Sequence, residues 1–134
     1  MTDTLASLER YCAARSLACA RRGGAVIVAI PTQERGPGGS LGVALAPRGD
    51  VVQFSSFVIR GPDSDHERVY RMLLRKNLDC HGFALALDAH GDVWARGELD
   101  RATLSDDQLD RLLGSFVDVV ETAWHALLRA GFVS

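Results

Sequence analysis

The sequence predicts a single α+β domain in which three helices cover a mainly antiparallel, five-stranded sheet. Apolar runs of strand length occur in neighbouring pairs joined by short turn sequences, which is typical of antiparallel hairpins. Stretches with helical spacing of apolar residues lie at both ends and in the middle of the chain. The predicted strands and helices do not alternate along the chain, and such alternation is what would indicate a parallel sheet. We therefore expect the order helix, three strands, helix, two strands, helix, in one domain that spans residues 1–134.

The first helix is expected over Asp3–Arg22, where Gly23 and Gly24 would end it. Its apolar stripe places Cys12 and Cys19, which are seven residues apart, on one face. With three cysteines in the chain, any disulfide scheme leaves one unpaired. We expect all three to be small apolar side chains in a reducing compartment.

Three strands are expected next. The first, Ala25–Ile30, is a β-branched run that a proline ends. The Gly- and Pro-rich stretch Thr32–Ser40 predicts a flexible loop. The strands Leu41–Ala46 and Val51–Ile59 are joined by Pro47–Asp50, whose proline and glycine predict the tight turn of a hairpin.

Two capping boxes mark the remaining helices. Ser64 and Glu67 form an S-x-x-E pattern, which predicts a helix that runs to about Leu78. Ser105 and Gln108 repeat the pattern before the last helix. That helix carries a broad apolar stripe, which we expect to be a core face or, in part, a dimer surface. The stripe comprises Leu109, Leu112, Leu113, Phe116, Val117, Val120, Trp124, Leu127 and Leu128.

The segment LDAHGDVWARGEL leaves two readings open, a small metal site or the tip of a hairpin. Asp88, His90 and Asp92 lie two residues apart, but such residues alternate in direction along an extended chain. An EF-hand loop that began at Asp88 would need glutamate at its twelfth position, which is Leu99. Gly91 supplies the positive φ that a short hairpin loop requires. We expect a turn and no metal. The two strands that it joins are Gly82–Asp88 and Asp92–Leu99.

The net charge and the hydropathy of the sequence indicate which classes of partner are not expected. Fifteen basic residues against seventeen acidic ones give a net charge of -2, which offers no electrostatic basis for nucleic-acid binding. No stretch approaches the ~20 apolar residues of a membrane span, and no signal peptide is recognisable. We expect a soluble, cytoplasmic protein that does not bind a membrane.

Several familiar catalytic and ligand-binding motifs are absent from the sequence. It contains no CxxC, HxxxH, GxxxxGK[ST] or GxGxxG pattern. Cys80 and His81 are adjacent, so their side chains would point to opposite sides of a strand. The alternative to a binding protein is a small cytosolic enzyme that uses Cys80 or a histidine, such as His66 or His125.

Four stretches together carry a family resemblance: HERVYRMLLRKN, GFALALDAHGDVWARGEL, LSDDQLDRLLG and LLRAGF. They cover roughly Pro62 to Phe132. The chain resembles the YbjN-like family, whose fold is similar to that of type III secretion chaperones. The resemblance implies a non-catalytic role in binding other proteins, chaperone-like or regulatory, often as a homodimer without cofactor.

An antiparallel sheet offers edges that an extended peptide can join, and apolar side chains on an exposed face can form pockets for it. We expect Phe54, Phe57 and Trp94 to bind the partner, with Arg96 as a polar neighbour. The other reading of these aromatic residues is that they belong to an ordinary core.

Overall fold

The computed structural model describes residues 3–32 and 39–131. Its helices are α1 (Thr4–Ala14), α2 (His66–Lys76) and α3 (Asp106–Gly131), and a short 3-10 turn, η1 (Asn77–Asp79), follows α2. Its strands are β1 (Ala18–Arg22), β2 (Ala25–Pro31), β3 (Ser40–Arg48), β4 (Val51–Ile59), β5 (Phe83–Leu87) and β6 (Val93–Asp100). They form one antiparallel sheet in the order β1-β2-β3-β4-β6-β5. The α+β class is confirmed, but the described part of the chain holds six strands rather than five.

The additional strand, β1, lies where the sequence predicts the second half of the first helix. Helix α1 ends at Ala14, and Ser16 adopts a left-handed conformation with φ 55°. Gly23 and Gly24, with φ 51° and 80°, then form the two-residue turn between β1 and β2. Such turns favour glycine because positive φ matches the twist of the flanking strands. All five residues of β1 are exposed, so this strand has no alternating apolar pattern that would reveal it in the sequence.

The two predicted capping boxes have different outcomes. At α3 the box is confirmed: the Gln108 backbone N–H donates to Ser105 Oγ, and the Ser105 N–H donates to Gln108 Oε1, both at 3.2 Å. At α2 the predicted box is wrong. The helix begins after Asp65, a left-handed residue with φ 53° whose side chain makes no cap hydrogen bond. Glu67 instead accepts from Arg71 along the helix.

The predicted hairpins are confirmed. Arg48 pairs with Val51 across a tight turn, in which Gly49 has φ 59°. Strands β5 and β6 pair across the Asp88–Asp92 segment, where Gly91 has φ 83°. Of the loop predicted over Thr32–Ser40, residues 33–38 lie outside the described part of the chain.

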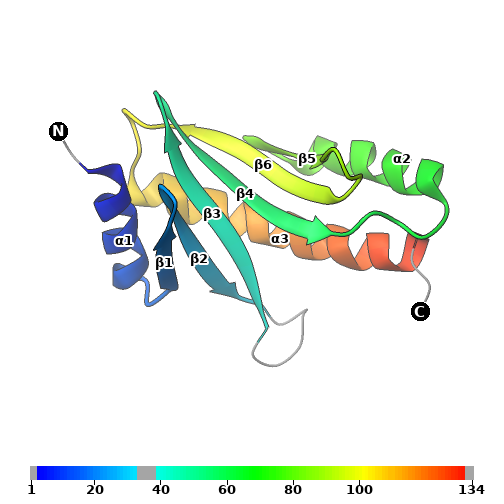
Figure 1. Cartoon of the computed structure of the whole chain (residues 1–134), viewed down its shortest axis with the longest axis horizontal. Helices are drawn as coiled ribbons and strands as arrows, with labels where there is room; N and C mark the ends of the chain where they lie inside the picture. The colour runs from blue at the N-terminus through cyan, green and yellow to red at the C-terminus, as the bar shows by residue number, and fades with distance from the viewer. Residues whose placement is uncertain (1–2, 33–38, 132–134) are drawn as a thin grey trace.

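The helices pack on one face of the sheet. In Figure 1, α3 runs along the sheet behind its strands, with α1 near one end and α2 near the other. Residues of all three helices join alternate residues of the strands in one core. The largest side chains that are fully buried in this core are Phe54, Phe116, Leu8, Leu41, Leu45, Leu109 and Leu127. The opposite face of the sheet, called the outer face below, carries the other strand residues, and none of the three described helices covers it.

No helix within residues 3–32 and 39–131 combines the length and the apolar character that a membrane crossing requires.

Candidate functional site

Strand β4 places the two predicted phenylalanines on opposite faces of the sheet. Phe54 is fully buried and packs edge to face against two other core phenylalanines. Phe57 is 43% exposed on the outer face. This follows from the period of two along a strand, because residues three apart point to opposite sides. Phe54 is therefore a core residue and does not line a surface, whereas Phe57, Trp94 and Arg96 lie together on the outer face.

The outer face carries an aromatic pair beside a shallow hollow. Phe57 and Trp94 are paired residues of β4 and β6, and their rings meet edge to face with centroids 5.5 Å apart. The hollow has a volume of about 290 Å³. We call Phe57 together with the lining of this hollow the outer-face patch. The lining consists of Ser55, Ala86, Leu87, Asp88, Trp94 and Arg96.

The hollow exists because small residues of β5 lie beside large residues of β6. Ala86 pairs with Trp94, and Ala84 pairs with Arg96. The alternation in FALAL sends Phe83 and Leu85 into the core and leaves the alanines on the outer face, whereas Leu87 at the end of the strand is exposed. Because the alanine side chains are small, the space beside the Trp94 indole and the Arg96 guanidinium can accept a side chain of a partner.

Asp88 holds the Trp94 ring in place. The indole Nε1 donates to Asp88 Oδ2 at 2.8 Å. The backbone N–H groups of His90 and Asp92 donate to the other carboxylate oxygen, at 2.8 and 3.0 Å. The indole hydrogen bond, with these backbone hydrogen bonds, lowers the pKa of Asp88 below its usual value. The sequence identifies Asp88 as a turn residue but does not reveal its contact with Trp94.

The Asp88–Asp92 segment is a hairpin turn, as predicted. Its second carboxylate, Asp92, accepts from the Gly61 N–H at 2.8 Å and so anchors the loop that leads to α2. The carboxylates of this segment therefore accept hydrogen bonds from backbone N–H groups and from the Trp94 indole. Across the described residues, no group of three or more His, Cys, Asp or Glu side chains is arranged to hold a metal ion.

The two edges of the sheet differ in their accessibility. At the β5 edge, the Asn77 side chain accepts from the Leu85 N–H at 2.7 Å and donates to the Leu85 carbonyl at 3.3 Å. The centre of this edge is therefore already paired, which protects it from joining another strand. At the other edge, all residues of β1 are exposed. An extended peptide would find open backbone groups at β1 rather than at the centre of β5.

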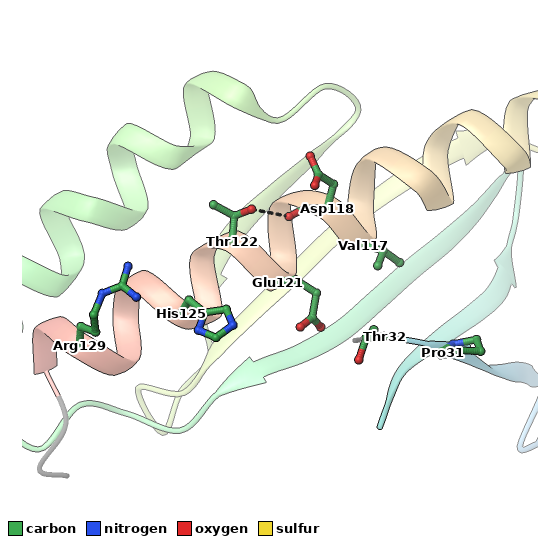
Figure 2. Close-up of a pocket in the computed structure, with 8 residues that line it drawn as sticks. All are labelled: Pro31, Thr32, Val117, Asp118, Glu121, Thr122, His125 and Arg129. Carbon is green, nitrogen blue, oxygen red and sulfur yellow. Dashed lines mark hydrogen bonds between the residues drawn. The ribbon is translucent and has the colours of Figure 1, made fainter. Parts of the chain in front are cut away.

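A second hollow, of about 440 Å³, lies between the end of β2 and α3 (Figure 2). The buried Glu121 carboxylate points from α3 toward Thr32, and His125 and Arg129 follow along the helix. The Thr122 hydroxyl is engaged in a hydrogen bond to the Asp118 carbonyl at 2.9 Å. Since the lining contains both acidic and basic groups, its chemistry does not select one class of ligand. The sequence gives no sign of this hollow, because its walls come from segments far apart in the chain.

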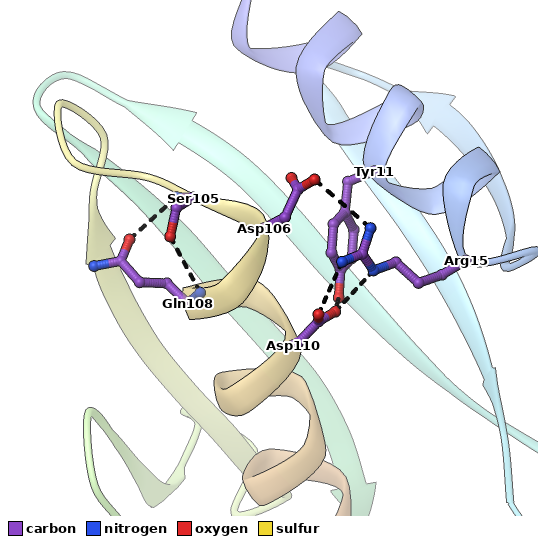
Figure 3. Close-up of polar contacts among 6 residues, drawn as sticks. All are labelled: Tyr11, Arg15, Ser105, Asp106, Gln108 and Asp110. Atoms are coloured by element: carbon purple, nitrogen blue, oxygen red, sulfur yellow. Dashed lines mark hydrogen bonds and ion pairs between the residues drawn. The ribbon is translucent and has the colours of Figure 1, made fainter.

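Helix α1 is tied to the start of α3 by a polar cluster (Figure 3). The Tyr11 hydroxyl donates to Asp110 Oδ1 at 2.6 Å, and the Arg15 guanidinium forms two hydrogen bonds to the same carboxylate, both at 2.8 Å. Arg15 also lies over the Tyr11 ring and pairs with Asp106 at 3.6 Å. These contacts join α1 to α3, so this cluster has a structural role.

Replacing Asp110 will change the response of the protein to acid. Hydrogen bonds from Arg15, followed by that from Tyr11, lower the pKa of Asp110 from 3.8 to about 2. Because the unfolded chain binds this proton more readily, the stabilisation is complete above about pH 4 and is lost as the pH falls toward 2. Urea unfolding measured between pH 5 and 2 should show a smaller loss of stability in Asp110→Asn than in wild type.

Asp107→Asn is the control for this prediction, because Asp107 makes no hydrogen bond or salt bridge with other described residues. Its acid profile should follow wild type. An Asp110→Asn profile parallel to that of wild type would contradict the assigned role of the cluster.

The cysteines lie in three different environments. Cys12 is buried in α1 and Cys19 is exposed on β1, so the prediction that one helix carries both is wrong. Burial raises the pKa of Cys12 to about 11. Burial also raises the pKa of Cys80, whose thiol donates to the Lys76 carbonyl at 3.5 Å. A raised pKa disfavours the reactive thiolate at both positions.

Comparison with known proteins places the chain in a family. The model of the YbjN family, described as "Putative bacterial sensory transduction regulator", matches residues 4–129. The chain belongs to the YbjN family. This confirms the resemblance identified from the second half of the sequence and extends it to α1 and the first strands.

Among curated proteins, the chain is similar to uncharacterized mycobacterial proteins. Over 83 residues it is 41% identical to the uncharacterized protein Rv0487 of Mycobacterium tuberculosis and 39% identical to the uncharacterized protein ML2442 of Mycobacterium leprae. Each match covers 62% of this chain and 45% of the relative. The match thus spans about half the length of these curated relatives.

Among solved structures, the fold is similar to YbjN from E. coli, with a TM-score of 0.68 at 11% identity over 90% of this chain and 87% of that chain. It is also similar to a chain of the ExsC–ExsE complex, with a TM-score of 0.66 at 18% identity over 94% and 97%. The Yersinia pestis type III secretion chaperone SycH, solved with a fragment of YscM2, gives 0.62 at 22% identity over 90% and 99%. At these identities the likeness shows the fold alone.

Proposed function

We propose that this protein is a non-catalytic binding module, chaperone-like or regulatory, that holds a segment of another protein in the cytoplasm. The outer-face patch is its binding surface. Phe57 and Trp94 provide apolar contact area, Arg96 provides a charged neighbour, and the hollow beside them accepts one apolar side chain of the partner. The proposal requires no metal and no cofactor.

The observation that carries this proposal is the exposed Phe57–Trp94 pair on a face of the sheet without a helix. Aromatic residues with a polar neighbour are enriched at the energetic centres of protein interfaces. Because Asp88 already fixes the indole, Trp94 loses little side-chain freedom when a partner binds. Three structures that share the fold are named as complexes with other proteins: ExsC–ExsE, HopA1–SchA and SycH–YscM2.

The open β1 edge supports the same class of function. An extended segment that pairs with β1 would gain backbone hydrogen bonds. At the centre of β5, the Asn77 side chain already occupies the Leu85 backbone N–H. The outer-face patch and the β1 edge lie at different ends of the sheet, since three strands separate β1 from β6. A partner that uses both would have to cross the outer face.

A displayed library of random peptides provides the test. Peptides that bind wild type are selected, and those that also bind the double variant Phe57→Ser/Trp94→Ser are removed. Both substituted residues lie on the outer face. Binding is then followed by the fluorescence of Trp94 in a Trp124→Phe background, in which Trp94 is the only tryptophan. We expect selected peptides to shift this emission and to bind Arg96→Ala or Phe57→Ala at least about tenfold more weakly.

Leu128→Ala is the matched control, because Leu128 is 40% exposed on α3, similar to Phe57 at 43%. It should leave the affinity unchanged. The proposal fails if no peptide is recovered, or if the recovered peptides bind the counter-selected variant as tightly as wild type.

The alternative function, a small enzyme that uses Cys80 or a histidine, predicts an activated thiol. We expect the opposite: an alkylating probe at neutral pH should modify the exposed Cys19 first and should modify Cys12 and Cys80 slowly. Mass spectrometry of the digested protein assigns each site. Modification of Cys80 well ahead of Cys19 would favour the enzyme.

Homodimerisation, which the family resemblance implies, stays a prediction. The apolar stripe of α3 does not support it, because the core accounts for most of the stripe and only Leu128 is largely exposed. Light scattering at micromolar concentration should give twice the chain mass of 14.5 kDa. A single 14.5 kDa species would contradict the prediction.

A further inference from the structure

Helix α2 presents leucine and arginine side chains together to solvent. Leu74 is 71% exposed, and Leu78, in the η1 turn that follows, is 81% exposed. Arg71 and Arg75 are also exposed and lie one turn apart. Residues three and four positions apart are neighbours on a helix surface. These four side chains therefore form one surface, which we call the α2 strip.

Packing in the hydrophobic core does not require the side chains of the α2 strip. Helix α2 uses Val69 and Leu73 to join the core, where it packs against α3 and β5. The strip lies on the exposed part of the helix, and its two leucines are the most exposed large apolar side chains in the described part of the chain. Two leucines at i and i+4 have the spacing with which one helix contacts another.

The charge of α2 differs from that of the whole chain. Residues His66–Lys76 include four basic side chains and one acidic side chain, in a chain with a net charge of -2. Glu67 forms a salt bridge with Arg71 at 2.7 Å. The other three basic side chains of α2 take part in no salt bridge with described residues. A partner that covers the leucines also covers Arg75, which forms no salt bridge with described residues, so it must supply negative charge to avoid burying this guanidinium unpaired.

Two other occupants fit less well. A second copy that docks its own α2 here would bring two basic helices together, and like charges across an interface are costly. A membrane surface favours a helix with a wide apolar face, often with Trp or Phe. The two buried apolar residues of α2, Val69 and Leu73, already belong to the core, and the strip offers only two leucines.

We propose that the α2 strip binds an acidic amphipathic segment of a partner protein. In this segment, Leu, Ile or Phe at helical spacing contacts Leu74 and Leu78, and flanking Asp or Glu side chains pair with Arg71 and Arg75. The strip is separate from the outer-face patch, so it adds a second contact surface whose existence does not depend on the first.

The test uses the full chain and a displayed library of peptides about 18 residues long, which is five turns of helix. Apolar positions are drawn from Leu, Ile and Phe at i, i+4 spacing, and the flanking positions are drawn from Asp and Glu. The peptides bound by wild type are then measured by fluorescence anisotropy. We expect Leu74→Ser/Leu78→Ser and Arg71→Glu/Arg75→Glu each to weaken binding at least about tenfold.

Two controls separate specific pairing from general attraction. Arg10→Glu/Arg48→Glu changes the net charge by the same amount at two exposed arginines outside α2, and it should leave the affinity within about twofold. A peptide in which Lys replaces the acidic positions should fail to bind wild type and should regain affinity for Arg71→Glu/Arg75→Glu. Because all four strip residues are exposed, circular dichroism of these variants should match wild type.

Several results would overturn the proposal. One is the absence of any binder in the acidic library, and another is equal weakening by the control Arg10→Glu/Arg48→Glu. Sedimentation with phosphatidylserine vesicles that is lost in Leu74→Ser/Leu78→Ser, without peptide binding, would assign the strip to a membrane. A dimer in light scattering that the same variant abolishes would assign it to a second copy.

Discussion

Gly97→Ala is expected to destabilise the protein by about 3 kcal/mol, at the upper end of the range for overpacked cores. Gly97 lies on the core face of β6, paired with Phe54 on one side and Phe83 on the other. An added Cβ would lie 2.5 Å from the Phe54 ring and 2.8 Å from Phe83 Cβ, and it would also collide with the Gly82 carbonyl oxygen. A backbone oxygen cannot move aside as a flexible side chain can, so the strands themselves would have to shift.

The glycine is necessary because three phenylalanines meet at this point. The ring of Phe116 lies 5.4 Å from that of Phe54 and 5.1 Å from that of Phe83, in both cases edge to face. The Phe54 ring and the Phe83 Cβ occupy the space above Gly97 that a side chain would otherwise fill. The aromatic cluster and the glycine are therefore one packing unit that links β4, β5, β6 and α3.

Gly114→Ala provides a control with the same chemical change. Gly114 is exposed in α3, and an added Cβ would meet nothing within 4 Å. This substitution should stabilise the protein by about 0.5–1 kcal/mol, because glycine is the poorer helix former. Urea unfolding of both variants gives the comparison. Equal free energies of unfolding for Gly97→Ala and wild type would contradict the packing at β6.

Phe54→Ala is expected to cost about 3–5 kcal/mol, the range for removing a large buried aromatic side chain. Phe57→Ala, three residues along the same strand, should cost about 1 kcal/mol or less. Phe54 is fully buried, whereas Phe57 is 43% exposed and contacts chiefly Trp94. The residue type, the strand and the substitution are the same. The difference between the two free energies of unfolding therefore reflects the face of the sheet on which each side chain lies.

Urea unfolding with a constant denaturant slope measures both variants of this pair. The result also bears on function. If Phe57→Ala cost as much as Phe54→Ala in the isolated protein, the outer face would be covered, and a second copy would be the first candidate to cover it. A small cost for Phe57→Ala together with a loss of peptide binding would instead assign Phe57 to the outer-face patch.

Local patterns in the sequence predicted most elements because each depends on neighbouring residues. The capping box at Ser105, the β3–β4 hairpin at Gly49 and the turn at Gly91 are recognisable from residues at most three apart. The residues that pair β1 with β2 are also close in sequence. That strand was nevertheless predicted as helix, because it is exposed on both faces and because Cys19 fits the stripe of α1 by its spacing.

The candidate site was predictable only in part. The period of two along β4 shows that Phe54 and Phe57 face opposite sides, but not which side the helices cover. The side-chain contacts that shape the site join different elements: the hydrogen bonds of Asn77 to Leu85 lie between η1 and β5. No pattern of neighbouring residues encodes such a contact.

The sequence by itself determined the α+β class, the antiparallel hairpins and the alternation of large and small residues on β5. These features follow from periodicity and turn chemistry, which act over a few residues. Only the tertiary structure decided which face of the sheet is open, which edge is protected and that Gly97 lies under an aromatic cluster. Those outcomes depend on where helices distant in the chain dock, and docking is settled by the packing of the whole core.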